Sequence, residues 1–132
     1  MNNLLFVYGT LMKASRHERH ALLAPLGRFV EDGSINGKLF LVSTYPGLIL
    51  SAASHDLVHG EVYELSAPEM ALATLDEYEE CSPRYADPTQ YVRQEVSVTL
   101  ASGGKLKAWT YIYNRSVENF QHISSGRFLT MS

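Results

Sequence analysis

Hydrophobic and polar positions follow distinct patterns along this chain, and these patterns predict strands at both of its ends. Residues 4–8 form an uninterrupted apolar run that ends at Gly9-Thr10, which is typical of a strand that is buried on both faces and enters a tight turn. In residues 92–100 mostly apolar residues alternate with polar ones, as in a half-buried strand. The turn sequence Ser102-Gly103-Gly104 then predicts a hairpin whose return strand covers residues 106–113.

The middle of the chain is expected to contribute three more strands. These cover residues 38–42, 48–50 and 57–65. The turn sequence Tyr45-Pro46-Gly47 and the polar stretch 51–56 separate them, which predicts short antiparallel connections.

Two Ser-x-x-Glu sequences predict helix starts, because such a pair forms a capping box. The first, residues 15–18, precedes a short helix through residues 20–23. The second, residues 66–69, opens a helix from about Pro68 to Glu79. The polar segment 81–90 is expected to form a loop.

The second helix places a carboxylate on its apolar face. At 100° per residue, Leu72, Leu75 and Glu79 share one stripe, whereas Glu77 projects from the opposite side. A partly buried carboxylate has a raised pKa, which suits a general base near neutral pH. The alternative is that the helix ends before Glu79 and leaves it as a solvated residue of the last turn.

The turn after the first strand is a second candidate feature. Gly9 stands where the strand leaves the sheet, and backbone N–H groups at such a turn can converge on an anionic group. A purely structural turn explains the same residues, since strand-Gly-Thr sequences are common.

Composition narrows the class of protein. The chain has 132 residues, of which 45% are hydrophobic and 19% charged, so a single globular domain is expected. The formal net charge is -3, without a concentrated basic patch, which argues against binding to nucleic acid or an anionic membrane. No apolar stretch is long enough for a membrane span of roughly 20 residues.

The cysteine content and the first residues favour the cytoplasm. Cys81 is the single cysteine, so no internal disulfide can form. Residues 1–9 lack the charged region, long apolar region and cleavage site of a signal peptide.

No cofactor and no metal are expected. Cys81 follows Glu79 and Glu80, whose charges disfavour a thiolate nucleophile. The histidine pairs at 17 and 20 and at 55 and 59 lack the carboxylate or cysteine partners of a metal site. The chain carries neither a phosphate-binding loop nor a dinucleotide fingerprint.

Three separated motifs resemble those of the γ-glutamylcyclotransferase superfamily, and in particular its small γ-glutamylamine cyclotransferase-like members. They read Phe-Val-Tyr-Gly-Thr-Leu at residues 6–11, Val-His-Gly-Glu-Val-Tyr at 58–63 and Leu-Asp-Glu-Tyr-Glu at 75–79, followed by Tyr-Val-Arg at 91–93. The resemblance extends from Leu5 to about Arg115. The position after Glu79 is Glu80, where many members carry glycine.

This resemblance implies a fold of the α+β class. It is the cyclotransferase-like fold, a small mixed five- or six-stranded β-barrel with flanking helices. Residues 1–115 would form the domain. Residues 116–132, which show no clear periodicity, would be a tail that packs on the same domain or is partly mobile.

The resemblance also implies an activity, in which a small γ-glutamyl amide, amine or peptide is cyclised to 5-oxoproline and a free amine. Glu79 would be the catalytic acid and base. Substrate-binding residues would be Tyr8, Gly9, Thr10 and Leu11, together with Tyr113 in preference to Tyr111. The protein would act as a monomer or weak homodimer on a small-molecule partner. The main alternative is a noncatalytic member that binds a small ligand or a protein.

Overall fold

The computed structural model describes residues 1–15, 18–80 and 89–128. Cys81, His17 and most of the loop expected at 81–90 lie outside these ranges. The elements, in chain order, are β1 (Leu4–Val7), η1 (Lys13–Ser15), α1 (His20–Leu23), β2 (Gly27–Leu41), β3 (Pro46–Leu50), β4 (Leu57–Leu65), α2 (Pro68–Tyr78), β5 (Tyr91–Leu100), β6 (Lys105–Tyr113) and β7 (Gln121–Ile123).

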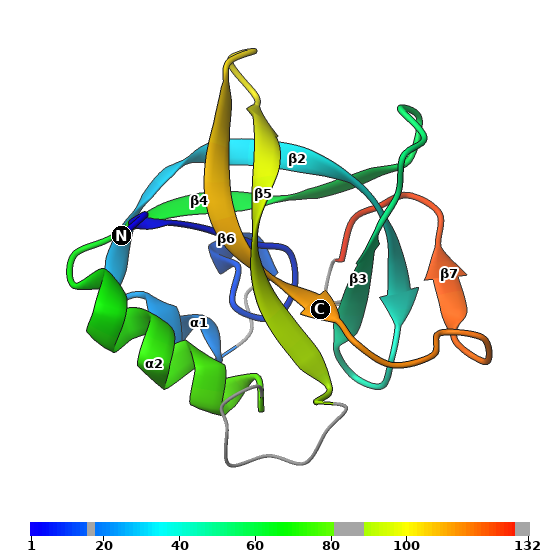
Figure 1. The fold of residues 1–132 in the computed structure, drawn as a ribbon, viewed down its shortest axis with the longest axis horizontal. Helices are drawn as coiled ribbons and strands as arrows, with labels where there is room; N and C mark the ends of the chain where they lie inside the picture. The colour runs from blue at the N-terminus through cyan, green and yellow to red at the C-terminus, as the bar shows by residue number, and fades with distance from the viewer. Residues whose placement is uncertain (16–17, 81–88, 129–132) are drawn as a thin grey trace.

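Five strands close into a β-barrel in the order β2-β4-β1-β6-β5, because β5 also pairs back onto β2. The barrel is mixed, since β1 runs parallel to β6 while the other neighbours are antiparallel. The helices lie toward one end of the molecule and β3 and β7 toward the other (Figure 1). The predicted α+β class and five-stranded mixed barrel are therefore confirmed. Among the described residues, no helix has the length and apolar character needed to cross a membrane.

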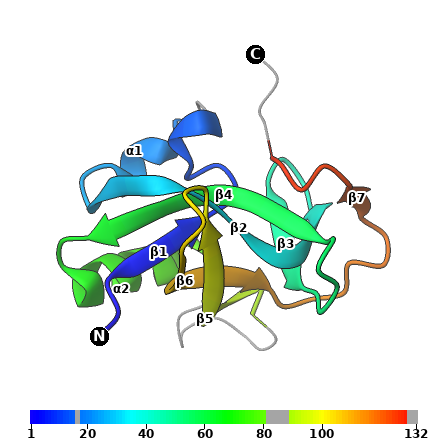
Figure 2. The same ribbon diagram turned by 90° about the horizontal axis from the view of Figure 1, so that it is seen from above.

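Strand β1 is buried on both faces, as its continuous apolar run predicts. Leu5 and Val7 join a core cluster that includes the apolar faces of α1 and α2. Phe6 and Tyr8 point the other way, into a second cluster with residues of β2, β4, β5 and β6. Strand β1 therefore links the two halves of the core. Each fully buried Leu or Phe contributes about 1.5–3 kcal/mol to the stability of the fold. Figure 2 shows β1 beside β4, with α1 above and α2 below the plane of these strands.

Strand β2 is much longer than the strand predicted at residues 38–42. It begins at Gly27, shifts register between Phe29 and Glu31, and pairs first with β4 and then with β3. The connection to β3 also lies earlier than predicted. Val42 and Ser43 donate backbone hydrogen bonds to the Tyr45 carbonyl, and Pro46 and Gly47 already belong to β3.

Neither predicted capping box caps its helix. The N-cap of α1 is Arg19 and that of α2 is Ala67, and neither side chain caps the helix. The Ser15 hydroxyl donates to the Met12 carbonyl at 2.7 Å. Ser66 donates through both its N–H and its hydroxyl to the Leu26 carbonyl. Ser15 therefore bonds the backbone just before it in the chain, and Ser66 bonds a distant segment, so neither hydroxyl caps the helix that follows.

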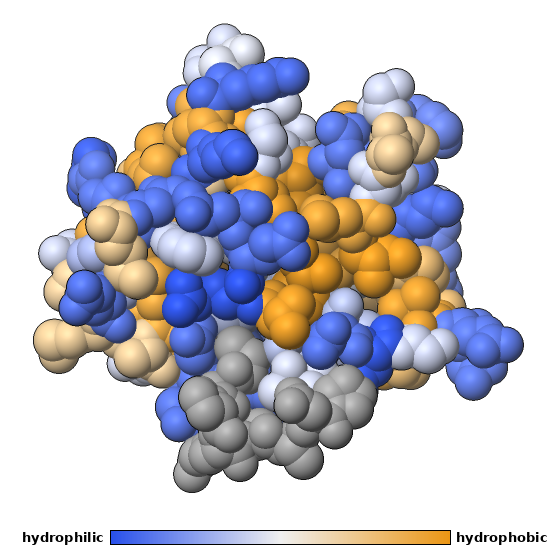
Figure 3. All heavy atoms as spheres, in the orientation of Figure 1, coloured by the Kyte–Doolittle hydropathy of each residue, from blue (hydrophilic) through white to orange (hydrophobic). Residues whose placement is uncertain are grey.

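The C-terminal segment packs on the barrel although its sequence lacks periodicity. The unpredicted strand β7 pairs with β2, placing Ile123 opposite Leu39. Farther along, His59 N–H donates to the Gly126 carbonyl at 2.8 Å, and Phe128 is buried in the barrel cluster. Val117 and Phe120, between β6 and β7 in the chain, are partly buried against the core. On the face drawn in Figure 3, apolar side chains gather between β6 and β3.

The close approach of β4 to β1 requires glycine at position 60, which gives a direct test of the barrel. A Cβ there would lie 2.2 Å from the Val7 carbonyl oxygen and 2.7 Å from Phe6 Cζ. We expect Gly60→Ala to lower the free energy of unfolding by about 3 kcal/mol through overpacking, as measured by urea denaturation. Gly104→Ala is the control, because its nearest heavy atom would be Leu100 Cδ1 at 3.9 Å. Equal losses in the two variants would contradict the described approach.

Candidate active site

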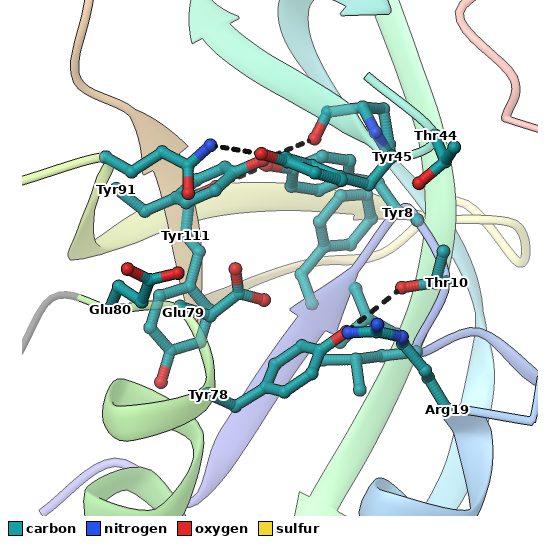
Figure 4. A pocket seen from close by; sticks show the side chains of 16 residues that line it. Tyr8, Thr10, Arg19, Thr44, Tyr45, Tyr78, Glu79, Glu80, Tyr91 and Tyr111 are labelled. Atoms are coloured by element: carbon teal, nitrogen blue, oxygen red, sulfur yellow. Dashed lines mark hydrogen bonds between the residues drawn. The ribbon is translucent and has the colours of Figure 1, made fainter. Parts of the chain in front are cut away.

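A pocket of about 300 Å³ opens beside the end of β1. Segments from distant parts of the chain line it: residues 6–11, Arg19, residues 44–46, residues 78–80, residues 90–91 and Tyr111. The end of α2 therefore meets the turn after β1 across this pocket (Figure 4).

Glu79 lies in this pocket, one residue beyond the last residue of α2. Its N–H still donates to the Leu75 carbonyl at 2.8 Å, so the helical path extends to this position. Ala71, Leu72 and Leu75 are buried against the core, as the face count predicts. Glu79 keeps some contact with solvent, yet protein surrounds its carboxyl on most sides. The helix does end before Glu79, but its side chain lines the pocket and is half-buried rather than fully solvated.

Burial is the main cause of the shifted pKa of Glu79. It raises the pKa from 4.5 to about 8, the Arg19 charge lowers it, and the Asp76 charge raises it. No hydrogen bond joins the Glu79 carboxyl to any residue in the described ranges. At neutral pH the carboxyl is mostly protonated in the empty pocket, and a cationic ligand beside it would favour the charged form.

The loop after β1 lines the pocket with all four residues that the resemblance indicates there, Tyr8 to Leu11. Met12 N–H donates to the Gly9 carbonyl at 3.1 Å and closes the turn. A Cβ at Gly9 would lie 2.9 Å from Pro46 Cγ, so the turn fits against β3 because position 9 is glycine. Within the described part of the chain, the N–H groups of residues 9–11 have no hydrogen-bond acceptor, and such groups suit an anionic ligand.

Glu61 fixes the segment that follows this loop. It is 2% exposed, and its carboxylate accepts hydrogen bonds from Lys13 N–H at 2.8 Å, Ala14 N–H at 3.1 Å and the Tyr63 hydroxyl at 2.8 Å. Sequence reasoning assigned Glu61 no role. Alternation along β4 places Glu61 on the same face as Tyr63 and Leu65, and a charged residue on such a face was the signal that could have found it.

The Tyr8 hydroxyl is hydrogen-bonded to the backbone of two strands. It donates to the Tyr111 carbonyl at 2.6 Å and accepts from Leu48 N–H at 3.3 Å. Burial, followed by the nearby Glu79 charge, raises its pKa well above the usual value. The ring lines the pocket, while the hydroxyl ties β1 to β6 and β3.

Tyr113, predicted to face the cavity, is not one of the described residues that line this pocket. Its ring packs edge-on against Tyr91 at 5.4 Å and Phe120 at 5.9 Å. Tyr111, two positions earlier on the same face of β6, lines the pocket instead. Tyr113 supports the pocket from behind, because its neighbour Tyr91 is itself a lining residue.

A polar clamp holds the last turn of α2 on the barrel. Arg93 donates to both carboxylate oxygens of Asp76, at 2.9 and 3.3 Å, and the Tyr111 hydroxyl donates to the same carboxylate at 2.7 Å. The Arg93 guanidinium also lies over the Trp109 ring. This clamp sets the position of α2, and so of Glu79 three residues later.

Sequence reasoning missed Arg19 and the pocket role of Tyr78. Arg19 Nη1 donates to the Tyr78 hydroxyl at 2.7 Å, and that hydroxyl lies 3.5 Å from Thr10 Oγ1. No local pattern brings these residues together, since they belong to three separate segments. Within the described ranges there is no cluster of three His, Cys, Asp or Glu side chains that could hold a metal ion.

Comparison with known proteins yields a family match over most of the chain. The sequence model of the family described as "Gamma-glutamyl cyclotransferase, AIG2-like" matches residues 5–130.

Two bacterial relatives and one mouse structure illustrate the match. YkqA of Bacillus subtilis, whose name assigns it to the gamma-glutamylcyclotransferases, is 34% identical over 128 residues; the match covers 96% of this chain but 41% of YkqA. Its crystal structure superposes with a TM-score of 0.73. The gamma-L-glutamyl-butirosin B gamma-glutamyl cyclotransferase of Niallia circulans is 38% identical, with 84% of this chain and 67% of that protein covered. An AIG2-like protein from Mus musculus shares the fold, at a TM-score of 0.74 and 22% identity, with 98% and 96% of the two chains covered.

The raised pKa of Glu79 makes stability depend on pH in a predictable direction. Between pH 4.5 and about 8 the unfolded chain releases this proton while the folded chain retains it, so the stability contributed by Glu79 falls as the pH rises. We expect the unfolding free energy of the wild type, relative to Glu79→Gln, to decline across this window and level off above it. Chemical denaturation of both proteins from pH 4 to 9 measures the difference. A flat difference would show that Glu79 titrates normally.

The buried bonds of Glu61 predict a second stability effect. Glu61→Gln removes the charge of a buried acceptor that serves three donors and should cost about 3 kcal/mol. Glu64→Gln on the same strand is the control, because its pair with Arg28 is exposed and such pairs are worth about 1 kcal/mol or less. Denaturation midpoints compare the two variants. A loss at Glu61 no larger than that at Glu64 would argue against the anchoring role.

Proposed function

This chain belongs to the gamma-glutamyl cyclotransferase, AIG2-like family, and we propose that it cyclises the γ-glutamyl group of a small γ-glutamyl amide, amine derivative or peptide. The products are 5-oxoproline and a free amine. One observation carries this proposal: the desolvated Glu79 carboxyl shares a pocket with the loop of residues 9–11.

The reaction needs a bent substrate more than an added reagent. The substrate's α-amine attacks its own γ-carbonyl carbon, a C–N bond forms to close the lactam, and the bond to the leaving nitrogen breaks. No water is consumed. Because both reacting groups belong to one molecule, holding them in an attack geometry supplies much of the rate enhancement.

Glu79 would move the proton that this reaction transfers. The α-amine is bound as an ammonium ion and must lose a proton before it attacks, and the leaving nitrogen must gain one. A carboxyl whose pKa is about 8 in the empty pocket is matched to an amine more closely than an ordinary carboxylate, so transfer in either direction costs little. The ammonium ion itself would favour the ionised carboxyl on binding.

The loop after β1 would hold the other end of the substrate. Its N–H groups at residues 9–11 suit the α-carboxylate, and Glu61 keeps the following turn in place through Lys13 and Ala14. If the substrate's α-carboxylate lies at the loop and its α-ammonium lies at Glu79, the side chain of the γ-glutamyl group would have to fold back toward its own α-amine.

The size of the pocket supports a small substrate. Its volume of about 300 Å³ lies at the lower end of the range for ligand sites. The name of the Niallia circulans relative gives a γ-glutamyl group on butirosin B as that protein's substrate, which supports a γ-glutamyl compound here. We further propose that the protein acts in the cytoplasm, as a monomer or weak homodimer, without nucleic acid or a membrane as partner.

In the noncatalytic alternative the protein binds a ligand without converting it, so Glu79 would have no catalytic role. This alternative would be favoured by a Glu79 on the open surface, whereas the carboxyl lies in the pocket. The position of Glu79 therefore supports the enzyme over the binding module.

Glu79→Gln tests the proposed function. The amide keeps the shape of the side chain but cannot accept the α-ammonium proton, so turnover should fall by about a hundredfold or more while the protein stays folded. The assay is 5-oxoproline release from a panel of γ-glutamyl amines, dipeptides and amides. Wild-type-like release by Glu79→Gln would rule out its catalytic role.

Glu77→Gln is the matched control for this experiment. Glu77 is exposed on α2, two residues from Glu79, and the same substitution there should change turnover by no more than about twofold. A large loss at Glu77 would contradict the assignment of the two carboxylates to different faces.

A further inference from the structure

One wall of the pocket is built from three side chains that meet only in the folded protein. Arg19 precedes α1, Thr10 follows β1 and Tyr78 ends α2. The Tyr78 hydroxyl accepts a hydrogen bond from Arg19 Nη1 at 2.7 Å and lies 3.5 Å from Thr10 Oγ1. The Tyr78 hydroxyl thus connects the Arg19 guanidinium to the side chain of Thr10, which belongs to the loop of residues 9–11 (Figure 4).

The charges on the pocket wall have a defined arrangement. Of the described residues that line it, Arg19 is the one cation, and the carboxyl groups are those of Glu79 and Glu80. Figure 4 shows Arg19 beside Thr10 and Tyr78, with Glu79 and Glu80 farther along the end of α2. A zwitterion with its carboxylate toward Arg19 and its ammonium toward Glu79 would match this arrangement.

We infer that Arg19 is a substrate-binding residue that pairs with the α-carboxylate of the γ-glutamyl group, and that Tyr78 holds the guanidinium beside the loop for this purpose. The inference rests on the proposed function. Backbone N–H groups alone recognise an anion through partial charges, whereas a guanidinium adds a full charge and a planar pair of donors that fits a carboxylate.

Tyr78 contributes position rather than charge. Its hydroxyl accepts from Arg19, and the guanidinium carbon lies 5.3 Å from the centre of its ring. Arg19 is otherwise exposed, and an exposed arginine loses considerable side-chain entropy when it is ordered by a ligand. Holding it against Tyr78 before the substrate arrives reduces this cost.

The pairing would also act on Glu79. The positive charge of Arg19 lowers the pKa of Glu79, so the two groups are close enough to interact. A carboxylate bound to Arg19 would offset that charge and make Glu79 a stronger base when the substrate is in place.

A pair of substrates that differ only at the α-carboxylate tests the inference. One is a γ-glutamyl alkylamide with a free α-carboxylate, and the other is its α-carboxamide. Arg19→Gln should lower kcat/KM for the carboxylate substrate about tenfold or more, as expected for loss of a charge-assisted pair that is partly exposed to solvent, and should change kcat/KM for the carboxamide little. The affinities of 5-oxoproline and 5-oxoprolinamide, measured by calorimetry, should show the same pattern without turnover.

Two further variants separate pairing from bulk charge and from folding. Arg28→Gln removes the same charge from an exposed residue on β2 that pairs with Glu64 and should leave both substrates unaffected. Tyr78→Phe keeps the charge of Arg19 but removes its hydrogen bond, so the loss for the carboxylate substrate should be smaller than that of Arg19→Gln. Thermal unfolding of each variant shows whether the fold is retained.

The outcomes are distinct. Equal losses for both substrates in Arg19→Gln would overturn the inference while leaving the proposed function standing. A loss confined to substrates whose leaving amine carries its own carboxylate would also overturn it, since Arg19 would then contact the leaving group. If the wild type releases 5-oxoproline from no substrate, the proposed function fails and the inference falls with it.

Discussion

The arrangement of this protein depends on holding the Glu79 carboxyl in a largely enclosed pocket where no described residue gives it a hydrogen bond. An enclosed carboxyl that accepts no hydrogen bond is unfavourable, and the surrounding structure supplies the free energy that holds Glu79 there. Leu72 and Leu75 bury one face of α2, and the bonds from Arg93 and Tyr111 to Asp76 prevent the end of the helix from turning outward. The raised pKa of Glu79 is therefore a property of how α2 packs on the barrel.

The pocket joins two parts that are fixed by different means. Its base belongs to the barrel, where the Tyr8 hydroxyl bonds the backbone of β6 and β3. Its rim comes from chain segments outside the barrel, which are positioned by polar contacts such as those of Glu61 with η1 and of Arg19 with Tyr78. Ligand specificity is more easily altered in the rim than in the base, because a rim residue can change without disturbing the core clusters.

Local sequence patterns predicted the elements whose burial follows from their own apolar residues. The apolar run of β1, the bounds of β4 and the buried face of α2 all agree with the structure. The strand predicted at residues 38–42 covers only the end of β2, whose earlier part contains Gly27, Gly33 and Gly37; in the structure these glycines allow close packing against β3, β4 and β5. The predicted caps failed because Ser15 bonds the preceding backbone at Met12 and Ser66 bonds the distant Leu26 carbonyl. Glu79 was found from its helical face, but Arg19 could not be, since its relation to Tyr78 exists only in three dimensions.

The position of β1 in the barrel has a consequence for how the protein is made. This strand comes before the other strands of the barrel in the chain, yet it pairs with β6 through Leu5 and Trp109 and with β4 through residues 61–64. Contacts between such distant parts of a chain form slowly, and the barrel cannot close until β5 and β6 have left the ribosome. Until then the apolar run of β1 stays exposed, and during synthesis it is the segment most in need of protection from aggregation.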